Sequence, residues 1–336
     1  MPLRPTALAA AFLCAALALP ALAAAPPAAR ILEREKLGTM KVMHVGSPAL
    51  AGALEKQGNV ALFVLLPPSY ARSPSRRYPV VYFLHGYSGS PSMVTGWEGA
   101  LGAAFSARPG SEFILVGVDG VSPMGGSFFV KGPIDGDWES WVVRDAVGVI
   151  DRTYRTVARR EARGLAGYSM GGFGALNLSL RHPDRFACTF ATGPGVMQPG
   201  DMKSAFDIWD RTFHEAYGRA FAPNPSSKDS LCDIPTWDGS PADAAVIARW
   251  EQGFGQWAEK LDAYAQRKPA LAAVHVEVGT DEAYPWILEG VRYLRKLSTE
   301  RGLGWEVEEF KGGHELSRDR VEGSMAPFFQ RCLRTR

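Results

Sequence analysis

The sequence predicts an α/β fold in which a mostly parallel central sheet carries helices on both faces. Short apolar runs alternate with helical patterns along most of the 336 residues. The runs are continuously apolar, as is typical of strands that are buried on both faces. Alternation of strand and helix places neighbouring strands parallel, because each helix carries the chain back across the sheet. The length and the 46% of hydrophobic residues suffice for one large core.

The predicted elements follow in order from residue 60. Strands are expected at 60–66, 79–84, 113–118, 164–168, 274–278 and 305–310. Helices are expected at 138–154, at 171–181, from Pro285 onward and at the end of the chain. Pro285 favours a helix start, because its missing N–H falls in the first turn, where that group has no partner in the helix.

Residues 195–268 interrupt this alternation. Helical stretches flank a loop at 222–241 that is rich in Pro, Ser and Asp. We expect an insertion over the carboxyl edge of the sheet, of which 195–241 forms part of a pocket wall. Changes at Phe206 or Trp237 in that wall are expected to alter the preference for substrate chain length. For three further tryptophans the sequence does not decide between a place in the core and a place in the pocket wall: Trp97, Trp138 and Trp286.

The N-terminus predicts a secretory signal peptide. Arg4 precedes an apolar stretch at 7–19, and a small-x-small cleavage site follows at 21–23. The stretch is short and ends at Pro20, which disfavours a transmembrane anchor. We therefore expect a secreted or periplasmic protein without stable membrane insertion. The chain then divides into a signal peptide at 1–23, a linker and N-terminal segment at 24–45, and the main domain at 46–336.

Charge and motif content exclude several classes of function. A formal net charge of +2 gives no reason to expect nucleic acid as a partner. Neither the H-E-x-x-H nor the C-x-x-C metal motif occurs, and no glycine-rich phosphate motif is present, so we expect no metal and no cofactor. Cys188 sits in the apolar run at 186–190 and is expected as a buried strand thiol, whereas a pairing of Cys232 with Cys332 is left open.

The motif that carries the chemistry is Gly-Tyr-Ser-Met-Gly at 167–171. It has the form G-x-S-x-G, and it follows an apolar strand and opens a helix, which is the setting of a nucleophile elbow. Glycines on either side of Ser169 leave room for the sharp turn. Ser169 is then the expected nucleophile, at a helix N-terminus whose dipole favours developing negative charge.

A second glycine-rich segment, His-Gly-Tyr-Ser-Gly at 85–89, follows another predicted strand. Acyl transfer requires two backbone N–H groups that donate to the oxyanion of the intermediate. We expect one from Met170, the residue after the nucleophile, and the other from Tyr87. His85 is interpreted as a structural residue that orients the loop.

The general base is expected at His314, which follows the last predicted strand and two glycines. The order Ser, acid, His along the chain is typical of this arrangement. The acid is expected after the preceding strand, where Asp281 and Glu282 compete. Counting in a Gly-x-x-acid turn from Gly279 favours Glu282, and Asp281 is then free to cap the following helix.

Three segments together resemble the esterase D-like family: YPVVYFLHGYSG at 78–89, the long stretch at 138–187 around GYSMGGFGA, and GGHELS at 312–317. That family includes S-formylglutathione hydrolases, feruloyl, acetylxylan and enterochelin esterases, and mycolyltransferases. The resemblance implies the α/β-hydrolase fold and a Ser–His–acid triad, and it is weakest over the helical and loop insertion that we expect above the active site. It also implies an oxyanion hole at Tyr87 and Met170. Family members usually have Asp where this chain has Glu282, so the identity of the acid is the point of departure.

The sequence as a whole predicts an exported serine carboxylic-ester hydrolase acting through an acyl-enzyme, with a small-molecule, carbohydrate or lipid ester as substrate. One alternative is an acyltransferase of the mycolyltransferase type, in which a sugar or lipid hydroxyl replaces water. Another is a non-catalytic surface binding protein on a hydrolase scaffold, which would have no need to keep Ser169, His314 and their glycines.

Overall fold

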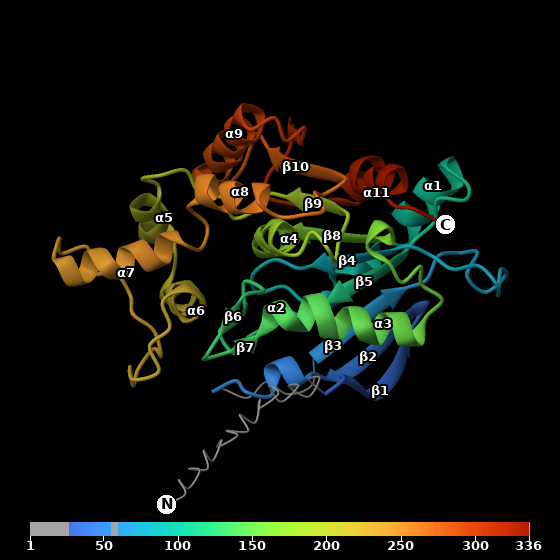
Figure 1. Cartoon of the computed structure of the whole chain (residues 1–336), viewed down its shortest axis with the longest axis horizontal. Coiled ribbons are helices and arrows are strands. Elements are labelled where there is room, and N and C mark those ends of the chain that lie inside the picture. Colours follow the sequence, from blue (N-terminus) through green and yellow to red (C-terminus); the bar gives the residue numbers. More distant parts are fainter. Residues whose placement is uncertain (1–26, 55–59, 336) are drawn as a thin grey trace, which may run out of the picture.

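A computed structural model describes residues 27–54 and 60–335 of the chain. Within those ranges a nine-stranded sheet has the order β1-β2-β3-β5-β4-β8-β9-β10-β11 (Figure 1). Strands β4, β5 and β8 to β11 pair in parallel, and β1, β2 and β3 extend the sheet in antiparallel fashion beside β5, which confirms the mostly parallel sheet. The strands are β1 (Arg30–Leu37), β2 (Met40–Gly46), β3 (Val60–Leu65), β4 (Val80–Leu84), β5 (Ile114–Val118), β8 (Arg163–Tyr168), β9 (Cys188–Thr192), β10 (Ala273–Gly279) and β11 (Glu306–Phe310). Strands β6 (Lys131–Gly132) and β7 (Gly136–Asp137) form a separate ribbon.

The sheet begins earlier in the chain than the expected domain boundary at residue 46. Strands β1 and β2 pair with each other, and β2 pairs with β3, so most of the segment at 24–45 belongs to the sheet. Strand β1 is almost wholly exposed and carries charged side chains, as is common for an edge strand that must avoid pairing with other molecules. The predicted signal peptide at 1–23 lies outside the described residues.

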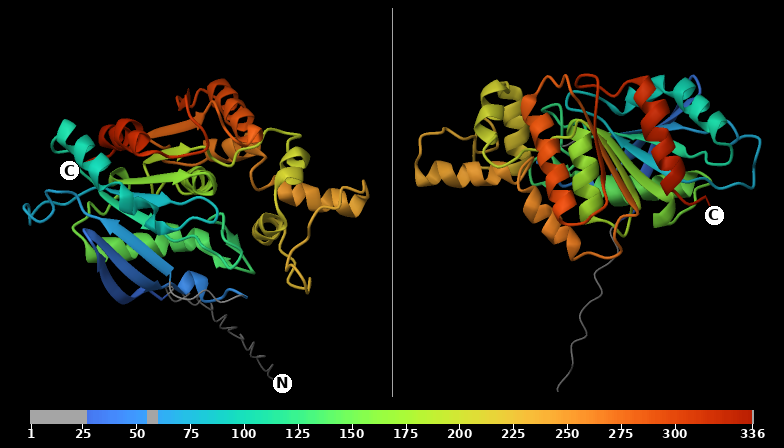
Figure 2. Two further views of the ribbon diagram at one scale, coloured as in Figure 1. Left: turned by 180° about the vertical axis from the view of Figure 1, so that it is seen from behind. Right: turned by 90° about the horizontal axis from the view of Figure 1, so that it is seen from above.

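Helices cover both faces of the sheet, as predicted. On one face lie α2 (Trp138–Ser140), a π-helical turn (Trp141–Ala146) and α3 (Val147–Thr153), which continue one another and match the helix expected at 138–154. The same face carries α4 (Met170–Arg181), α8 (Trp257–Ala265) and α9 (Pro285–Glu300). The opposite face carries α1 (Glu98–Ala107), a second π-helical turn (Val321–Met325) and α11 (Ala326–Cys332) (Figure 2). The short α10 (Arg318–Arg320) directly precedes that turn and buries none of its residues.

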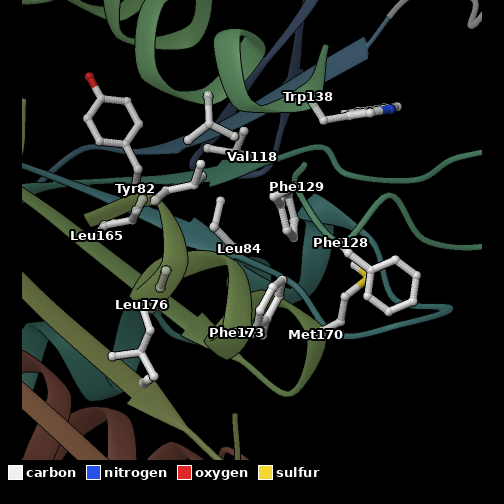
Figure 3. Packing of buried hydrophobic residues seen from close by; sticks show 14 of the residues in the cluster. Tyr82, Leu84, Val118, Phe128, Phe129, Trp138, Leu165, Met170, Phe173 and Leu176 are labelled. Carbon is white, nitrogen blue, oxygen red and sulfur yellow. The ribbon is translucent and has the colours of Figure 1, made fainter. Parts of the chain in front are cut away.

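Two hydrophobic cores result, one on each face. Successive residues of β4 alternate between them, so that Tyr82 and Leu84 join one core while Phe83 joins the other. The first core is rich in aromatic side chains, many of them on or beside α4 (Figure 3). Trp138 is fully buried there and donates from Nε1 to a backbone carbonyl over 2.9 Å, while Trp97 packs edge-on against Phe83 in the second core. Both tryptophans are therefore core residues.

The insertion predicted at 195–268 contains α5 (Met202–Ile208), α6 (Arg211–Phe221), α7 (Pro241–Glu251) and α8. Helices α5, α6 and α7 gather at one end of the molecule (Figure 1). Aromatic contacts attach this region to the elbow helix, because the ring of Phe173 on α4 lies 5.1 Å from that of Phe254 and 5.9 Å from that of Phe221. The position of the insertion is thus coupled to the helix that follows Ser169.

The prediction of a free thiol at Cys188 was wrong, and the pairing of Cys232 with Cys332 that the sequence left open does not occur. Cys188 is joined to Cys332 by a disulfide, with Cα atoms 6.4 Å apart, and Cys232 is a buried free thiol. Cys188 on β9 and Cys332 at the end of α11 meet in the second core. This is a tertiary contact between distant segments, which no local sequence pattern reveals. Over the described residues, no helix has the length and apolarity to cross a membrane.

Candidate active site

The turn between β8 and α4 holds Ser169 in an unusual backbone conformation. Its φ is 55° and its ψ −118°, a positive φ that side-chain-bearing residues rarely adopt. The glycines on either side are required for space: a Cβ at Gly167 would lie 1.9 Å from the Gly171 carbonyl oxygen, and one at Gly171 would lie 2.0 Å from that of Leu84. The sharp turn places Met170 as the first residue of α4, where its N–H has no partner within the helix.

A chain of two hydrogen bonds joins Ser169 to His314 and His314 to Glu282. His314 Nε2 lies 2.9 Å from Ser169 Oγ, and its Nδ1 lies 2.8 Å from Glu282 Oε2. The Glu282 carboxylate is fully buried and the His314 side chain is 13% exposed, so the chain is largely shielded from bulk water. These residues lie beyond the carboxyl ends of β8, β10 and β11, where parallel strands commonly deliver functional side chains.

Of the two acid candidates, Glu282 is the carboxylate brought to the imidazole. Asp281 is exposed, and its backbone N–H donates to the Gly312 carbonyl over 2.8 Å, which ties its turn to the loop before His314. The expected capping role of Asp281 was wrong, because α9 has Tyr284 at its N-cap and no side-chain cap. The Tyr284 N–H donates instead to Glu282 Oε1 over 3.1 Å, so both oxygens of that carboxylate accept hydrogen bonds.

Tyr168 holds the loop that carries His314. Its hydroxyl donates to the His314 carbonyl oxygen over 2.7 Å, and its ring lies 5.1 Å from the imidazole. Burial, together with the nearby Glu282 carboxylate, raises the pKa of Tyr168 to about 12, so the hydroxyl stays a donor at neutral pH. Sequence reasoning missed this residue, although it occupies the position directly before the nucleophile.

The loop after β4 packs directly against the elbow. A Cβ at Gly86 would lie 3.1 Å from the ring of Tyr168 and 3.4 Å from Ser169 Cβ, and the next residue, Tyr87, lines the same cavity as Ser169 and Met170. His85 is fully buried; its Nδ1 donates to the Gly86 carbonyl and its Nε2 accepts from an N–H of the neighbouring loop. Burial lowers the pKa of His85, and both ring nitrogens are occupied, in agreement with the predicted structural role.

Ser169 and His314 open into a cavity of about 400 Å³. The insertion supplies Trp209 and Phe213 to its wall, and Trp286 of α9 contributes a third aromatic ring, so that one of the three tryptophans left open by the sequence does line the pocket. Asp210 is the one carboxylate among the described lining residues, which include no Lys or Arg. The cavity therefore suits an uncharged, largely apolar group.

Phe206 and Trp237, which the sequence predicted in this pocket, lie elsewhere. Phe206 stacks on His214 at 3.9 Å between ring centroids, and Trp237 packs against Phe206 at 5.5 Å. Trp209, just past the end of α5, occupies the place expected for them, because the helix directs its buried side chains away from the cavity. The sequence predicted that this insertion would contribute to the pocket wall, but not which of its aromatic residues would face the cavity.

In the described part of the chain, two groups of side chains bring together ligand atoms of the kind that bind metals. Glu33, Glu35 and His44 lie on β1 and β2 at the exposed edge of the sheet. The second group is the buried pair His275 and Glu277 with the exposed Glu308. The guanidinium of Arg320 donates to both carboxylates and so already supplies the positive charge there. Neither group lies among the residues that line the Ser169 cavity.

Gly193, directly after β9, determines how closely the backbone approaches the imidazole. Its φ is +50°, and a Cβ there would lie 3.2 Å from His314 Nδ1 and 3.6 Å from Glu282 Oε2. Gly193→Ala is expected to displace the imidazole and to weaken the downfield proton resonance of the His314–Glu282 hydrogen bond. Gly200→Ala is the matched control, since Gly200 has a φ of +96° but no neighbour within 4 Å. Both variants carry a backbone strain of about 1–2 kcal/mol; an unchanged resonance in Gly193→Ala would contradict the predicted displacement.

Comparison with known proteins supports a family assignment. A family model described as "Putative esterase" matches residues 54–318. Two proteins of Mycobacterium tuberculosis, "Esterase MT1326" of strain CDC 1551 / Oshkosh and "Esterase Rv1288" of strain ATCC 25618 / H37Rv, are each 26% identical over 275 residues. The match covers 78% of this chain and 54% of each relative, so the chain spans about half the length of these relatives.

Solved structures establish the fold. A ferulic acid esterase is 19% identical with a TM-score of 0.60, over 88% of this chain and 98% of the other. An S-formylglutathione hydrolase from Staphylococcus aureus is 12% identical with a TM-score of 0.59, over 87% of this chain and 98% of the other. These similarities confirm the predicted α/β-hydrolase fold. The family model matches well over half of the length of this chain, so the chain belongs to the family described as "Putative esterase".

Proposed function

We propose that the protein hydrolyses carboxylic esters through an acyl-enzyme formed on Ser169. The observation that carries the proposal is the continuous hydrogen-bonded chain from Ser169 Oγ to His314 and Glu282, at 2.9 and 2.8 Å. These distances are those required between a nucleophile, its general base and the group that orients the base. Family membership supports ester hydrolysis as the reaction.

Each group has one role in the proposed reaction. His314 Nε2 removes the proton from Ser169 Oγ as the oxygen attacks the ester carbonyl carbon, and Glu282 stabilises the imidazolium through Nδ1. The backbone N–H groups of Tyr87 and Met170 donate to the oxyanion of the tetrahedral intermediate. His314 then protonates the leaving alcohol, and the same groups activate water to release the acid from the acyl-enzyme. No cofactor takes part in these steps.

The substrate class follows from the cavity. Its aromatic wall favours an uncharged ester with an apolar acyl or alcohol group, either a small molecule or an esterified carbohydrate or lipid. We also propose that the protein is exported to the periplasm or the medium. Arg4, the short apolar stretch and the small residues at 21–23 support this, and a mature N-terminus after Ala23 would test it.

Removal of the nucleophile tests the proposal. Ser169→Ala is expected to lower kcat for a chromogenic ester by about 10⁴-fold or more, because attack then depends on water and the remaining binding groups. The thermal unfolding temperature should stay near that of the native protein, since one oxygen is lost at a half-exposed position. A variant with near-native turnover would exclude Ser169 as the nucleophile.

A pair of tryptophan variants tests the pocket. Trp209 lines the cavity and Trp237 does not, although both come from the insertion and both are half-buried. Trp209→Ala is expected to lower kcat/KM for a long-chain aryl ester about tenfold relative to the acetyl ester, a difference of about 1.4 kcal/mol. Trp237→Ala should change both substrates alike. Selective loss with Trp237→Ala instead would place the acyl group on the other side of α5.

A further inference from the structure

We infer that Glu277, whose carboxylate is buried, and the partly exposed Arg320 form an ionic clamp that positions His314 for proton transfer. The inference rests on the proposed function and assigns positioning roles to two residues that touch no substrate. Glu277 lies on β10, ahead of the turn that carries Glu282, and Arg320 ends α10, just beyond the loop that carries His314. Their pairing joins the two segments that must stay in register for the imidazole to reach both of its partners.

Arg320 closes the base of the His314 loop. The loop at 311–317 leaves the end of β11 and returns through α10, where the guanidinium donates to Glu277 and to Glu308 of β11. The Arg320 Cζ also lies 4.5 Å from the ring centroid of Phe310, the last residue of β11. The two ends of the loop are therefore in contact, while the Tyr168 hydroxyl holds its middle. A short loop fixed at both ends and at its centre has little freedom to move its imidazole.

The Glu277 carboxylate connects this loop to the nucleophile. It is fully buried and accepts hydrogen bonds from Thr192 Oγ1 and Ser324 Oγ, each over 2.9 Å. The carbonyl oxygen of Thr192 accepts from the Ser169 N–H over 3.0 Å, and the Gly193 N–H donates to the Glu277 carbonyl over 2.8 Å. One carboxylate thus contacts the segment behind Ser169, while its own strand leads to Glu282.

The charges around the clamp explain why both partners are needed. Glu277 and Glu308 face one guanidinium, and His275 lies 3.6 Å from Glu277 and 3.0 Å from Glu306. Burial opposes ionisation of Glu277, but the charge of Arg320 and hydrogen bonds from Arg320 and Thr192 hold its pKa below the ordinary value. Loss of Arg320 leaves a buried carboxylate beside a second one, so the local structure must rearrange.

The test compares kcat and KM for a chromogenic ester, measured well below each unfolding temperature, in four variants. They are Arg320→Met, Glu277→Gln, the double variant with both changes, and Arg292→Met as control. Arg292 pairs with Glu309 on the same strand β11, but it is exposed and does not contact the His314 loop. Glu277→Gln keeps the shape of the side chain, and the double variant removes both charges, so these two guard against a variant that fails to fold.

Arg320→Met is expected to lower kcat at least about tenfold with KM within about twofold, because a displaced base impairs the chemical step rather than binding. The double variant should lose no more than Arg320→Met, since the two residues act as one unit. The downfield proton resonance of the His314–Glu282 hydrogen bond should weaken in parallel, and Arg292→Met should leave all readouts within about twofold.

The clamp would be overturned if Glu277→Gln and the double variant both kept kcat within about twofold of the native value. It would also be overturned if the variants raised KM and left kcat unchanged. Ser169→Ala, assayed in the same series, separates the two claims. If Ser169→Ala is inactive while the clamp variants are fully active, the clamp alone fails. If Ser169→Ala is active, the proposed function fails.

Discussion

The backbone of Ser169 is the constraint on which the rest of the site depends. A positive φ at a residue with a side chain is costly and persists only where the surroundings enforce it. Here the enforcement comes from close packing, since Gly167 and Gly171 approach backbone oxygens at distances that no Cβ permits. The Ser169 N–H donates to Thr192, and its carbonyl accepts from Phe173, which fixes the turn between strand and helix. The hydroxyl is thereby held toward the cavity, within reach of His314.

The remaining groups reach this fixed hydroxyl because parallel strands end at one edge of the sheet. Strands β4, β8, β9, β10 and β11 each deliver a loop there, and each loop contributes a group to the site or to its support. Such an edge brings groups from distant parts of the chain together on rigid elements. The entropic cost of holding the reacting atoms in the correct geometry is thereby lowered. The pairing of the buried Glu277 carboxylate with Arg320 joins two of these loops to each other.

Much of the sheet could be predicted from the sequence because its central strands are continuously apolar. The elbow at Ser169 and the loop at His314 could also be located, since glycine spacing and strand order are local signals. The choice between Asp281 and Glu282 depended on which side chain the turn directs inward, and counting from Gly279 favoured the residue that the structure brings to the imidazole. The wall of the cavity was less predictable, because Trp209, just past the end of α5, lines it and Phe206 within α5 does not.

Strand β1 and the disulfide show where sequence reasoning fails. Strand β1 carries charged residues at an exposed edge, so it lacks the apolar run that marks a buried strand. The pairing of Cys188 with Cys332 depends on α11 packing against β9, and Glu277 with Arg320 likewise meet only in the folded chain. Contacts of this kind join residues far apart in sequence, where no periodicity or spacing predicts which partners meet.

The central claim is that Glu282, His314 and Ser169 act as one hydrogen-bonded unit. The most direct measurement is kcat for a chromogenic ester in Glu282→Gln and Asp281→Asn, two neighbouring carboxylates of which one contacts the imidazole and the other is exposed. Glu282→Gln is expected to lower kcat at least about 10²-fold, because an amide lacks the charge that stabilises the imidazolium and favours the wrong tautomer. Asp281→Asn should cost less than about tenfold. The reverse ranking, or near-native kcat in both variants, would contradict the account.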